Sequence, residues 1–343
     1  MKTHQVQQKT ERRISAALRL VFVAALLLGQ IALAFFLSTE LRQRAAIIYT
    51  VLELAAFGYA VRIYNRTDGA SYKFGWIFLV LTVPVVGLIL YFLWNGDRQQ
   101  KRLDLKKLPM PEEPEAQQAA HRIQMEKLRR KFPQWERLSV YLSRQGYLLY
   151  GDTETTYLPT GEMFLQDMLE KLEQAEHFIF LEFFIIAQGQ IWDRMEEIFR
   201  RKAAAGVEVK ILFDDFGSMM RFPAGQIEAL RESGVEVQVF NPVHHYVNRL
   251  YFNYRDHRKI VCIDGSTAYT GGANVADEYA NLTVRFGYWK DCGIRLDGPG
   301  AWGLTREFLH MWQRNGGQLM QERDYYRPHD HREAAGFCQN SAA

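Results

Sequence analysis

The stretch that decides the fold is Asn253–Tyr279, which reads NYRDHRKIVCIDGSTAYTGGANVADEY. His257 and Lys259 stand two residues apart at the start of a branched apolar run, so on a strand both side chains project from the same face. Asp264-Gly265 is a strong hairpin-turn signal, and the residues after it are expected to return as a second strand. The stretch therefore predicts a β-hairpin that opens with a histidine and a lysine on one face.

Two glycines and an asparagine follow this hairpin. Gly271 and Gly272 let the backbone approach another group closely, and Asn274 stands at the start of an expected helix. Donors at a helix start, together with the helix dipole, favour an anion. A histidine, a lysine and such a cradle at one sheet edge suit a phosphoester better than an acyl group.

Helical and strand patterns alternate ahead of this stretch. Apolar residues recur at helical spacing over Glu162–Ala175 and Trp192–Ala205. Branched and aromatic runs at His177–Ile186, Val207–Phe213 and Val235–Phe240 predict buried strands. The repetition predicts an α/β fold with a mixed, largely parallel sheet flanked by helices, and chemistry at the carboxyl ends of its strands.

Apolar runs precede the α/β part. Leu20–Thr39 and Phe74–Trp94 are each long enough to cross a hydrocarbon core of roughly 30 Å, whereas Ala45–Val61 is shorter and contains Glu53. The first run is too long for an ordinary signal peptide, which favours a retained anchor. Basic residues flank both ends of the region, which favours two effective spans, but a third span stays open. We therefore expect two or three transmembrane helices.

The remaining segments differ in composition. Residues 96–135 are charged and rich in proline, which indicates a linker, with a short amphipathic helix expected around Ala119–Lys131. Residues 321–343 form a polar tail. The net charge of +3 is too balanced for a protein that coats nucleic acid, and the three cysteines form no closely spaced pair, so neither a zinc knuckle nor a disulfide framework is expected.

The motif His257-x-Lys259-x4-Asp264, followed by Gly-Gly-x-Asn at 271–274, resembles the HKD signature of the phospholipase D superfamily. Its surroundings resemble bacterial cardiolipin synthases, and so does the front of the chain, over nearly the whole stretch from Ala45 to about Asn315. The segments that carry this resemblance are LEFFII (181–186), LFDDFGS (212–218), NYRDHRKIVCIDG (253–265), TGGANVADEY (270–279), FGYWKDCGIRLDGP (286–299) and NRTDGASYKFGWIFLVLTVPVVGLILYFLW (65–94).

The resemblance implies a mechanism. His257 would attack a phosphodiester and form a phosphatidyl-histidine intermediate, Lys259 and Asn274 would hold phosphoryl oxygens, and Asp264 would orient and charge-balance a histidine. The glycine pair at 271–272 would help to bind the phosphate. In this family two phosphatidylglycerol molecules give cardiolipin and glycerol, with no cofactor and no metal required.

The resemblance also implies a place in the cell and a domain plan. The chain would sit in the bacterial plasma membrane as a multi-pass protein with its catalytic part in the cytoplasm, bound to phosphatidylglycerol and other anionic phospholipids. Residues 1–95 would be the anchor, and residues 136–320 would be a phospholipase D-like catalytic half.

One departure from the family pattern stands out. Family synthases carry two HKD motifs whose histidines share one active site, whereas this sequence holds one, and His310 and the cluster at 329–331 have the wrong spacing. Either the chain is a truncated or regulatory fragment, or two chains form a homodimer that supplies both histidines. A phosphodiesterase or nuclease of the same superfamily is a further alternative, which the apolar runs and the near-neutral charge disfavour.

Several residues around the motif have two readings. Glu182 lies in an apolar strand and needs a partner if buried; it either orients a motif residue or forms a structural pair. Asp214 and Asp215 either line the site or form a turn. The remaining candidates are a basic cluster suited to anionic headgroups and aromatic residues suited to a membrane interface: Arg249, Arg255 and Arg258, and Tyr246, Tyr251 and Phe252.

Overall fold

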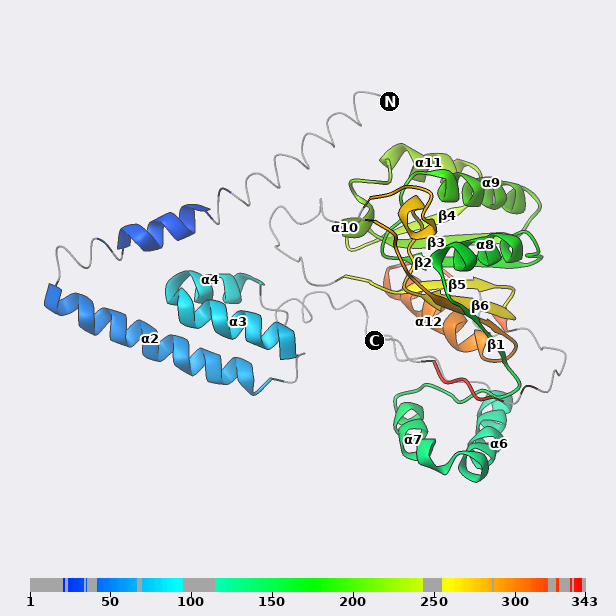
Figure 1. The fold of residues 1–343 in the computed structure, drawn as a ribbon, viewed down its shortest axis with the longest axis horizontal. Helices are drawn as coiled ribbons and strands as arrows, with labels where there is room; N and C mark the ends of the chain where they lie inside the picture. The colour runs from blue at the N-terminus through cyan, green and yellow to red at the C-terminus, as the bar shows by residue number, and fades with distance from the viewer. Residues whose placement is uncertain are drawn as a thin grey trace. The chain divides into compact units, whose positions relative to one another are not determined.

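The computed structural model describes two compact units (Figure 1), each taken by itself below. The N-terminal helical unit contains the described residues up to 94, and the α/β unit contains those from 115 onward. The described residues are 21, 24–33, 35, 42–66, 70–94, 115–242, 255–285, 287–319, 325–326, 334 and 336–340.

In the N-terminal helical unit, one described helix is long and apolar enough to cross a membrane. It is α2 (Arg42–Tyr64), whose apolar part is Ile47–Tyr64. This helix contains the run that the sequence marked as the weakest candidate. Of the first expected span, residues 24–33 are described and form a shorter apolar helix, while most of the remainder lies outside the described residues.

The expectation of a single span over residues 74–94 is wrong. Helix α3 (Ala70–Thr82) ends before Pro84, and α4 (Pro84–Trp94) begins there and folds back against α3 (Figure 1). Proline cannot donate a backbone hydrogen bond and breaks the helical ladder. Helix α4 packs closely on α3, because a Cβ on Gly87 would lie 2.5 Å from the backbone oxygen of Leu79.

The break is supported by a side chain from the first apolar run. The backbone N–H of Val86, in the first turn of α4, donates to Oε1 of Gln30 at 2.9 Å. A helix leaves its first N–H groups without intrahelical partners, so the glutamine satisfies one of them. Ala56, Ile63, Val80 and Tyr91 then pack into one buried cluster that joins α2, α3 and α4.

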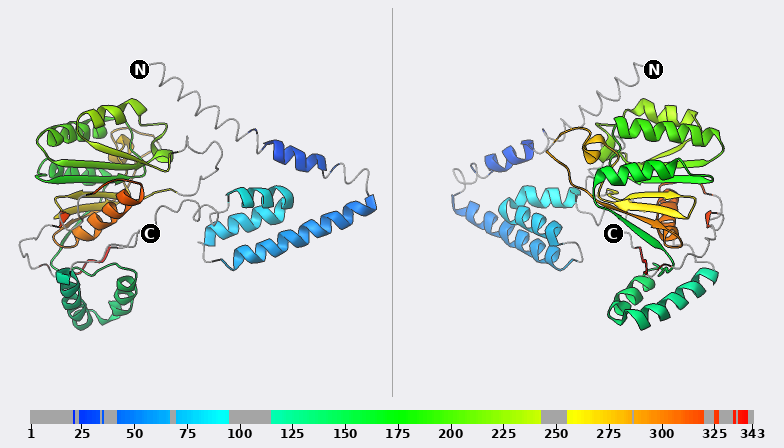
Figure 2. Two further views of the ribbon diagram at one scale, coloured as in Figure 1. Left: turned by 180° about the vertical axis from the view of Figure 1, so that it is seen from behind. Right: turned by 45° about the vertical axis from the view of Figure 1, so that its right-hand side comes forward.

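The described residues of the α/β unit form a seven-stranded sheet (Figure 2), in the order β1-β7-β6-β5-β2-β3-β4. Only β2, β3 and β4 run parallel to one another; the other neighbours are antiparallel. The strands are β1 Glu154–Leu158, β2 Phe178–Phe183, β3 Glu208–Asp214, β4 Glu236–Phe240, β5 Lys259–Ile263, β6 Thr267–Gly271 and β7 Gly293–Asp297.

The α/β fold with a mixed, helix-flanked sheet is therefore confirmed, but the sheet is not largely parallel. The turn at Asp264-Gly265 joins β5 to β6 as an antiparallel hairpin, as expected. β5 also runs antiparallel to β2, and β6 runs antiparallel to β7. The hairpin therefore joins the parallel strands β2, β3 and β4 to an antiparallel half of the sheet.

Helices cover both faces of the sheet. On one face α8 (Gly161–Leu172) and α9 (Gln190–Ala204) pack over Ile179, Leu181 and Phe183 of β2. On the other face α12 (Ala301–Arg314) lies against β2, β5 and β6, where Phe180 and Phe308 stack at 4.8 Å between ring centroids. Period-two alternation therefore sends successive strand residues toward different helices.

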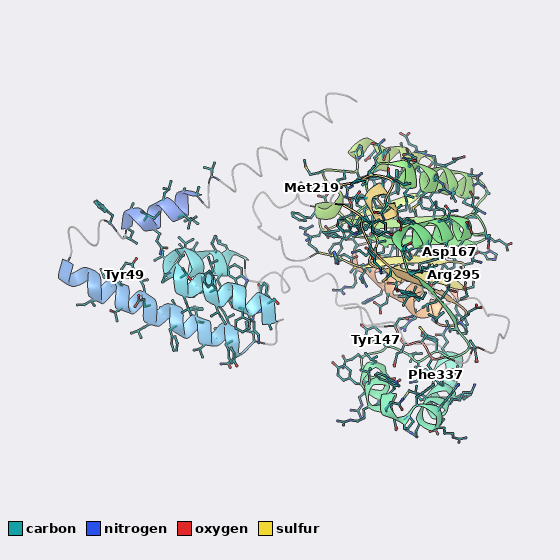
Figure 3. The ribbon with its side chains drawn as sticks, viewed as in Figure 1. Tyr49, Tyr147, Asp167, Met219, Arg295 and Phe337 are labelled. Atoms are coloured by element: carbon teal, nitrogen blue, oxygen red, sulfur yellow. The ribbon has the colours of Figure 1, made fainter. Side chains whose placement is uncertain are left out.

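An ion pair joins α8 to β7, the strand next to the edge of the sheet. Arg295 of β7 and Asp167 of α8 are labelled in Figure 3, and their charged groups lie 2.6 Å apart. The hydroxyl of Tyr269 donates to the same carboxylate at 2.5 Å. Three shorter helices complete the α/β layer: α10 Asp215–Ser218, α11 Ala224–Glu232 and the 3-10 helix η3 Asp277–Ala280.

The segment expected as a linker is helical where it is described. Helix α6 (Glu115–Lys131) is longer than the expected amphipathic helix and is followed by η1 (Pro133–Trp135) and α7 (Glu136–Arg144). Hydrogen bonds join α6 to the α/β layer: Trp302 Nε1 donates to Gln117 Oε1 at 2.9 Å. Residues 115–135 are thus part of the α/β unit, and residues 96–114 lie outside the described residues.

Candidate active site

The site is built around the entry to strand β5, where His257 and Lys259 face the same aromatic ring. The imidazole of His257 lies 4.8 Å from the ring of Phe184, and the Lys259 ammonium lies 5.5 Å from the centroid of that ring. The ammonium also donates to the backbone oxygen of His257 at 2.5 Å. The two side chains are thus brought together on one face.

The ionisation of the pair suits attack on a phosphoester. The ring of His257 is exposed, and partial burial, helped by the charge of Lys259, lowers the pKa of His257. Its imidazole is therefore neutral at pH 7 and has a lone pair to use as a nucleophile. Burial lowers the pKa of Lys259 to about 8, so this side chain is still mostly cationic at neutral pH.

Arg258 lies between these two residues and points to the opposite face of the sheet, where it contacts buried carboxylates. Its guanidinium lies 2.5 Å from Glu182 of β2, 3.1 Å from Asp256 and 3.3 Å from Glu307 of α12. All three carboxylates are buried. The geometry shows Glu182 as the ion-pair partner of Arg258, the residue between His257 and Lys259, and its role in orienting a motif residue stays a prediction.

Three carboxylates around one guanidinium do not all stay ionised. Burial raises the pKa of Glu182 well above its usual range, and the neighbouring Asp256 adds to the rise. Burial also pushes the pKa of Asp256 upward, but a hydrogen bond from Glu182 and the charge of Arg258 outweigh it, and the net pKa is lowered. Glu182 is thus the carboxyl of this pair with the stronger tendency to keep its proton.

Asp214, at the end of β3, fixes the chain just before the motif. Its carboxylate accepts from the backbone N–H of Asp256 at 3.0 Å and from Arg255 at 3.2 Å. The same carboxylate caps α10 by accepting from Phe216 N at 2.8 Å. Asp214 is thus a positioning residue, whereas Asp215, buried in the first turn of α10, remains a predicted site residue.

Asp264 does not orient His257. It follows the last residue of β5, and seven residues of extended chain place it roughly 20 Å from His257. Its carboxylate instead accepts three backbone N–H groups, at 2.7 to 2.8 Å, from the start of β2: Glu176, His177 and Phe178. The motif aspartate therefore anchors the far end of the strand.

The glycine pair serves strand packing, and its expected part in phosphate binding stays a prediction. Gly271 faces Gly293 of β7, and a Cβ on Gly271 would lie 2.6 Å from the backbone oxygen of Cys292. The N–H of Gly272 donates to that same oxygen at 3.1 Å. The expected helix at Asn274 is the four-residue η3, which begins at Asp277. These two glycines thus let β6 and β7 approach each other.

Asn274 is buried and joins the motif region to the loop after β2. Its Oδ1 accepts from Ile185 N at 3.0 Å, and its Nδ2 donates to the Tyr279 hydroxyl at 2.8 Å. Ile185 follows Phe184, the residue that contacts both His257 and Lys259. Nδ2 keeps a second hydrogen, which the expected phosphate contact would use.

Several of the positioning residues were not predicted as such. Asp256 and Arg258 flank His257 in the motif, and strict strand alternation would have placed Arg258 on the opposite face. Glu307 and Phe184 carry no local signal, because their roles arise from packing between distant segments. Within the described residues, no group of three or more histidine, cysteine, aspartate or glutamate side chains could hold a metal ion. The aromatic and basic candidates Tyr246, Arg249, Tyr251 and Phe252 lie outside the described residues.

Comparisons with known families agree with the resemblance seen in the motif. Residues 168–284 match the family model described as "Cardiolipin synthase, PLD-like domain", and residues 54–95 match the one described as "Phospholipase_D-nuclease N-terminal". The first match contains the strand entry that carries His257 and Lys259. The chain thus carries a phospholipase D-like domain of the cardiolipin synthase kind.

Curated relatives match over part of their length. An uncharacterized protein of Streptococcus mutans is 37% identical over 69% of this chain and 51% of its own length. Cardiolipin synthase 2 of Bacillus anthracis is 32% identical over 76% of this chain and 50% of its own length. Among solved structures, NucT from Helicobacter pylori is 10% identical, with a TM-score of 0.37 over 47% of this chain and 97% of that chain. The chain spans about half the length of the curated relatives it matches.

The packing role of the glycine pair is testable by Gly271→Ala. We expect the added methyl group to force β6 and β7 apart and to lower the free energy of unfolding by about 2 kcal/mol. For a unit of this size that lowers the melting temperature by about 4–8 °C, measured by thermal unfolding of the full chain in detergent. Gly336→Ala is the matched control, because its Cβ would meet nothing within 4 Å. An unchanged melting temperature for Gly271→Ala would contradict the packing role.

The arginine cluster is testable by two substitutions. Arg258→Ala leaves buried carboxylates without their cation and is expected to lower the free energy of unfolding by about 3–5 kcal/mol. Glu182→Gln imitates the protonated carboxyl and is expected to cost about 1 kcal/mol or less at neutral pH. The raised pKa of Glu182 makes the native state bind an extra proton, so the wild type loses stability as pH rises above the usual glutamate range, and Glu182→Gln does not. Thermal unfolding across pH checks this, and equal pH slopes for both chains would contradict it.

Proposed function

We propose that this chain is a membrane phosphatidyltransferase of the cardiolipin synthase type, with His257 as its nucleophile. The observation that carries the proposal is an exposed, neutral imidazole held beside a lysine, inside a domain that matches the cardiolipin synthase family. The curated relatives named cardiolipin synthase support the same substrate class.

The proposed reaction has two displacements at phosphorus. A ring nitrogen of His257 attacks the phosphorus of one phosphatidylglycerol, a P–N bond forms, and the bond to the glycerol oxygen breaks. Glycerol leaves with a proton taken from a general acid. The hydroxyl group of a second phosphatidylglycerol then gives its proton to the same group, which now acts as a base, and attacks the phosphorus of the phosphatidyl-histidine. A P–O bond forms and the P–N bond breaks, which yields cardiolipin and restores the free imidazole.

Lys259 and Asn274 act on the charge of the phosphoryl group. The ammonium of Lys259 is close to His257 and largely desolvated, which strengthens its attraction for non-bridging oxygens. Asn274 contributes the remaining N–H of its amide. Asp214 and Arg258 hold the backbone of the motif, so the histidine need not be ordered by the substrate.

The proposal places the general acid on a second histidine from a homodimer partner. The sequence contains one HKD motif, and the exposure of His257 leaves room for a second catalytic surface in front of it. The apolar length of α2 supports attachment to the membrane, with the active site near its lipid substrates. A phospholipase D that transfers the phosphatidyl group to water is the second candidate, because the same exposure admits water.

The nucleophile assignment is tested with labelled phosphatidylglycerol and the full chain in mixed micelles. Cardiolipin and glycerol are expected from the wild type, and His257→Ala should reduce their formation by at least about 10³-fold. His177→Ala is the matched control, since His177 is exposed in the same unit at the other end of the sheet. Phosphatidic acid in place of cardiolipin would favour the hydrolase, and no product at any protein concentration would refute both activities.

The dimer is tested by the concentration dependence of the same assay. A site completed by a partner predicts a specific activity that rises with protein concentration and then reaches a plateau. A mixture of wild-type chain with excess His257→Ala chain gives the complementary test. Each mixed dimer holds one intact motif and lacks one of the two histidines, so a shared site predicts a fall in activity per wild-type chain. Specific activity that is independent of concentration down to full dissociation, measured by light scattering, would contradict a shared site.

The pH profile tests the role of Lys259. Because only the protonated ammonium binds phosphoryl oxygens, activity should fall as pH rises through the lysine pKa of about 8. Lys259→Arg keeps its charge to far higher pH, so its residual activity should not show this alkaline fall. An identical alkaline limb in both chains would assign the fall to another group.

A further inference from the structure

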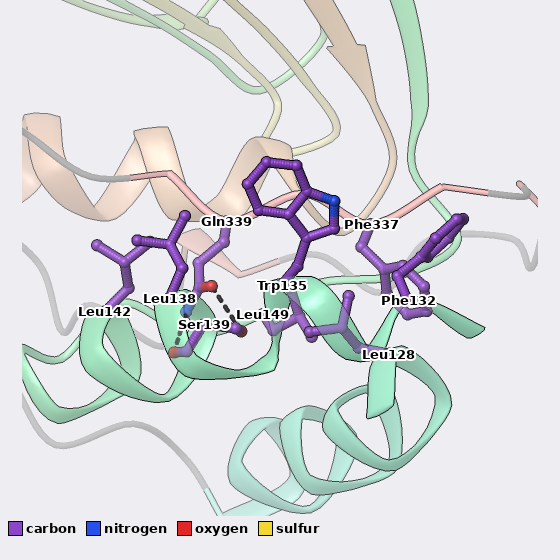
Figure 4. Close-up of a pocket in the computed structure, with 9 residues that line it drawn as sticks. All are labelled: Leu128, Phe132, Trp135, Leu138, Ser139, Leu142, Leu149, Phe337 and Gln339. Carbon is purple, nitrogen blue, oxygen red and sulfur yellow. Dashed lines mark hydrogen bonds between the residues drawn. The ribbon is translucent and has the colours of Figure 1, made fainter. Parts of the chain in front are cut away.

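The α6–η1–α7 segment carries an apolar groove that the catalytic proposal does not use. The groove has a volume of about 380 Å³ and lies between α6, α7 and the segment at 336–340 (Figure 4). Most of its walls are aliphatic and aromatic side chains, with Ser139 and Gln339 as the polar members. The apolar residues are Leu128, Phe132, Trp135, Leu138, Leu142, Leu149 and Phe337. We call residues 115–144 the amphipathic hairpin.

One face of α7 is occupied and the other is not. The amide of Gln339 donates to the backbone oxygen of Ser139 at 3.2 Å, and its Oε1 accepts from the Ser139 hydroxyl at 2.7 Å (Figure 4). The same amide donates to the backbone oxygen of Tyr147 at 2.7 Å. On the outward face, Leu138 is 50% exposed and Tyr141 is 60% exposed. About half of the surface of each of these side chains is left uncovered by the described residues of the chain.

A basic cavity adjoins the groove. It has a volume of about 290 Å³ and is lined by Lys127, Arg130 and Lys131, with Asp152 as its acidic group, and it shares Phe337 with the groove. Lys127 and Arg130 make no ion pair within the described part of the chain. Over residues 115–144 there are seven basic and three acidic side chains.

We propose that the amphipathic hairpin docks onto the surface of a bilayer that contains anionic phospholipid. The apolar groove and the outward face of α7 take up the acyl-chain boundary, and the basic cavity receives a lipid phosphate. Trp135, 55% exposed, and Tyr141 have the apolar body and polar tip that suit the headgroup level of a membrane. A basic, amphipathic helical segment with aromatic residues on its apolar side is the composition of interfacial helices.

The chain itself limits how far this surface can be from a membrane. Helix α6 begins 21 residues after α4 ends, a length of at most about 70 Å when fully extended. The positive charge of the basic cavity is complementary to acidic headgroups, which selects an anionic lipid surface as the occupant. The docking is a property of the amphipathic hairpin and does not depend on phosphatidyl transfer by His257.

The test is hydrogen–deuterium exchange on the full chain in nanodiscs, read at the peptides that cover residues 132–144. Nanodiscs of phosphatidylcholine alone are compared with nanodiscs of phosphatidylcholine and phosphatidylglycerol. We expect exchange in this segment to be several-fold slower with phosphatidylglycerol, and the protection to weaken as salt is raised. The apolar contact is probed by Leu138→Ser, which should remove most of the protection.

Charge reversal separates lipid binding from a general charge effect. The double variant Lys127→Glu, Arg130→Glu should lose the phosphatidylglycerol-dependent protection. The double variant Lys171→Glu, Arg194→Glu on α8 and α9 makes the same change in net charge and should keep it. Exchange in β2 and β5 verifies that each variant is folded.

Three results would overturn the docking proposal. Equal protection in both kinds of nanodisc would assign the groove to another part of the chain, and protection that varies with protein concentration would assign it to a second copy. Absence of protection in either lipid would leave the surface facing water. None of these results bears on His257, and loss of phosphatidyl transfer in the assay above would not remove the protection.

Discussion

The site depends on a buried guanidinium that holds one strand from behind. Arg258 is the residue between His257 and Lys259, and strand alternation sends it to the face under α12, where it meets Glu182, Asp256 and Glu307. A cation taken from water needs such partners, and removing one of them would leave a buried charge exposed to a low dielectric. Arg258 is fixed on the α12 face of the sheet, so His257 and Lys259 on either side of it project from the opposite face.

Two aspartates secure the ends of the same strand. Asp214 holds the backbone at Asp256, just before the histidine, while Asp264 holds the start of β2 from the far end of β5. The motif is thus a device for aligning β5 with β2 as well as a set of reactive groups. The motif aspartate Asp264 serves the alignment, so its spacing from His257 matters without contact between the two side chains.

The chain also shows how apolar length and membrane geometry differ. Residues 74–94 contain enough apolar residues for one span, yet Pro84 divides them into α3 and α4, and Gly87 lets the second helix lie against the first. The amphipathic hairpin shows the opposite: its sequence is charged and of low hydropathy, yet it presents an exposed apolar surface. Composition alone predicts neither result. The first depends on where Pro84 divides the apolar run, and the second depends on which face of α7 is exposed.

The sequence by itself determined the α/β pattern, the β5–β6 hairpin and the pairing of His257 with Lys259, because strand period and turn chemistry act over a few neighbouring residues. Only the tertiary structure decided that most strand pairs are antiparallel, that Gly271 lets β6 approach β7 closely, and that Glu307 completes the arginine cluster. These features join segments that are far apart in the chain, so no local pattern records them. The same physical limit explains why the sequence placed His257 beside Lys259 but did not show that Asp264 contacts the start of β2.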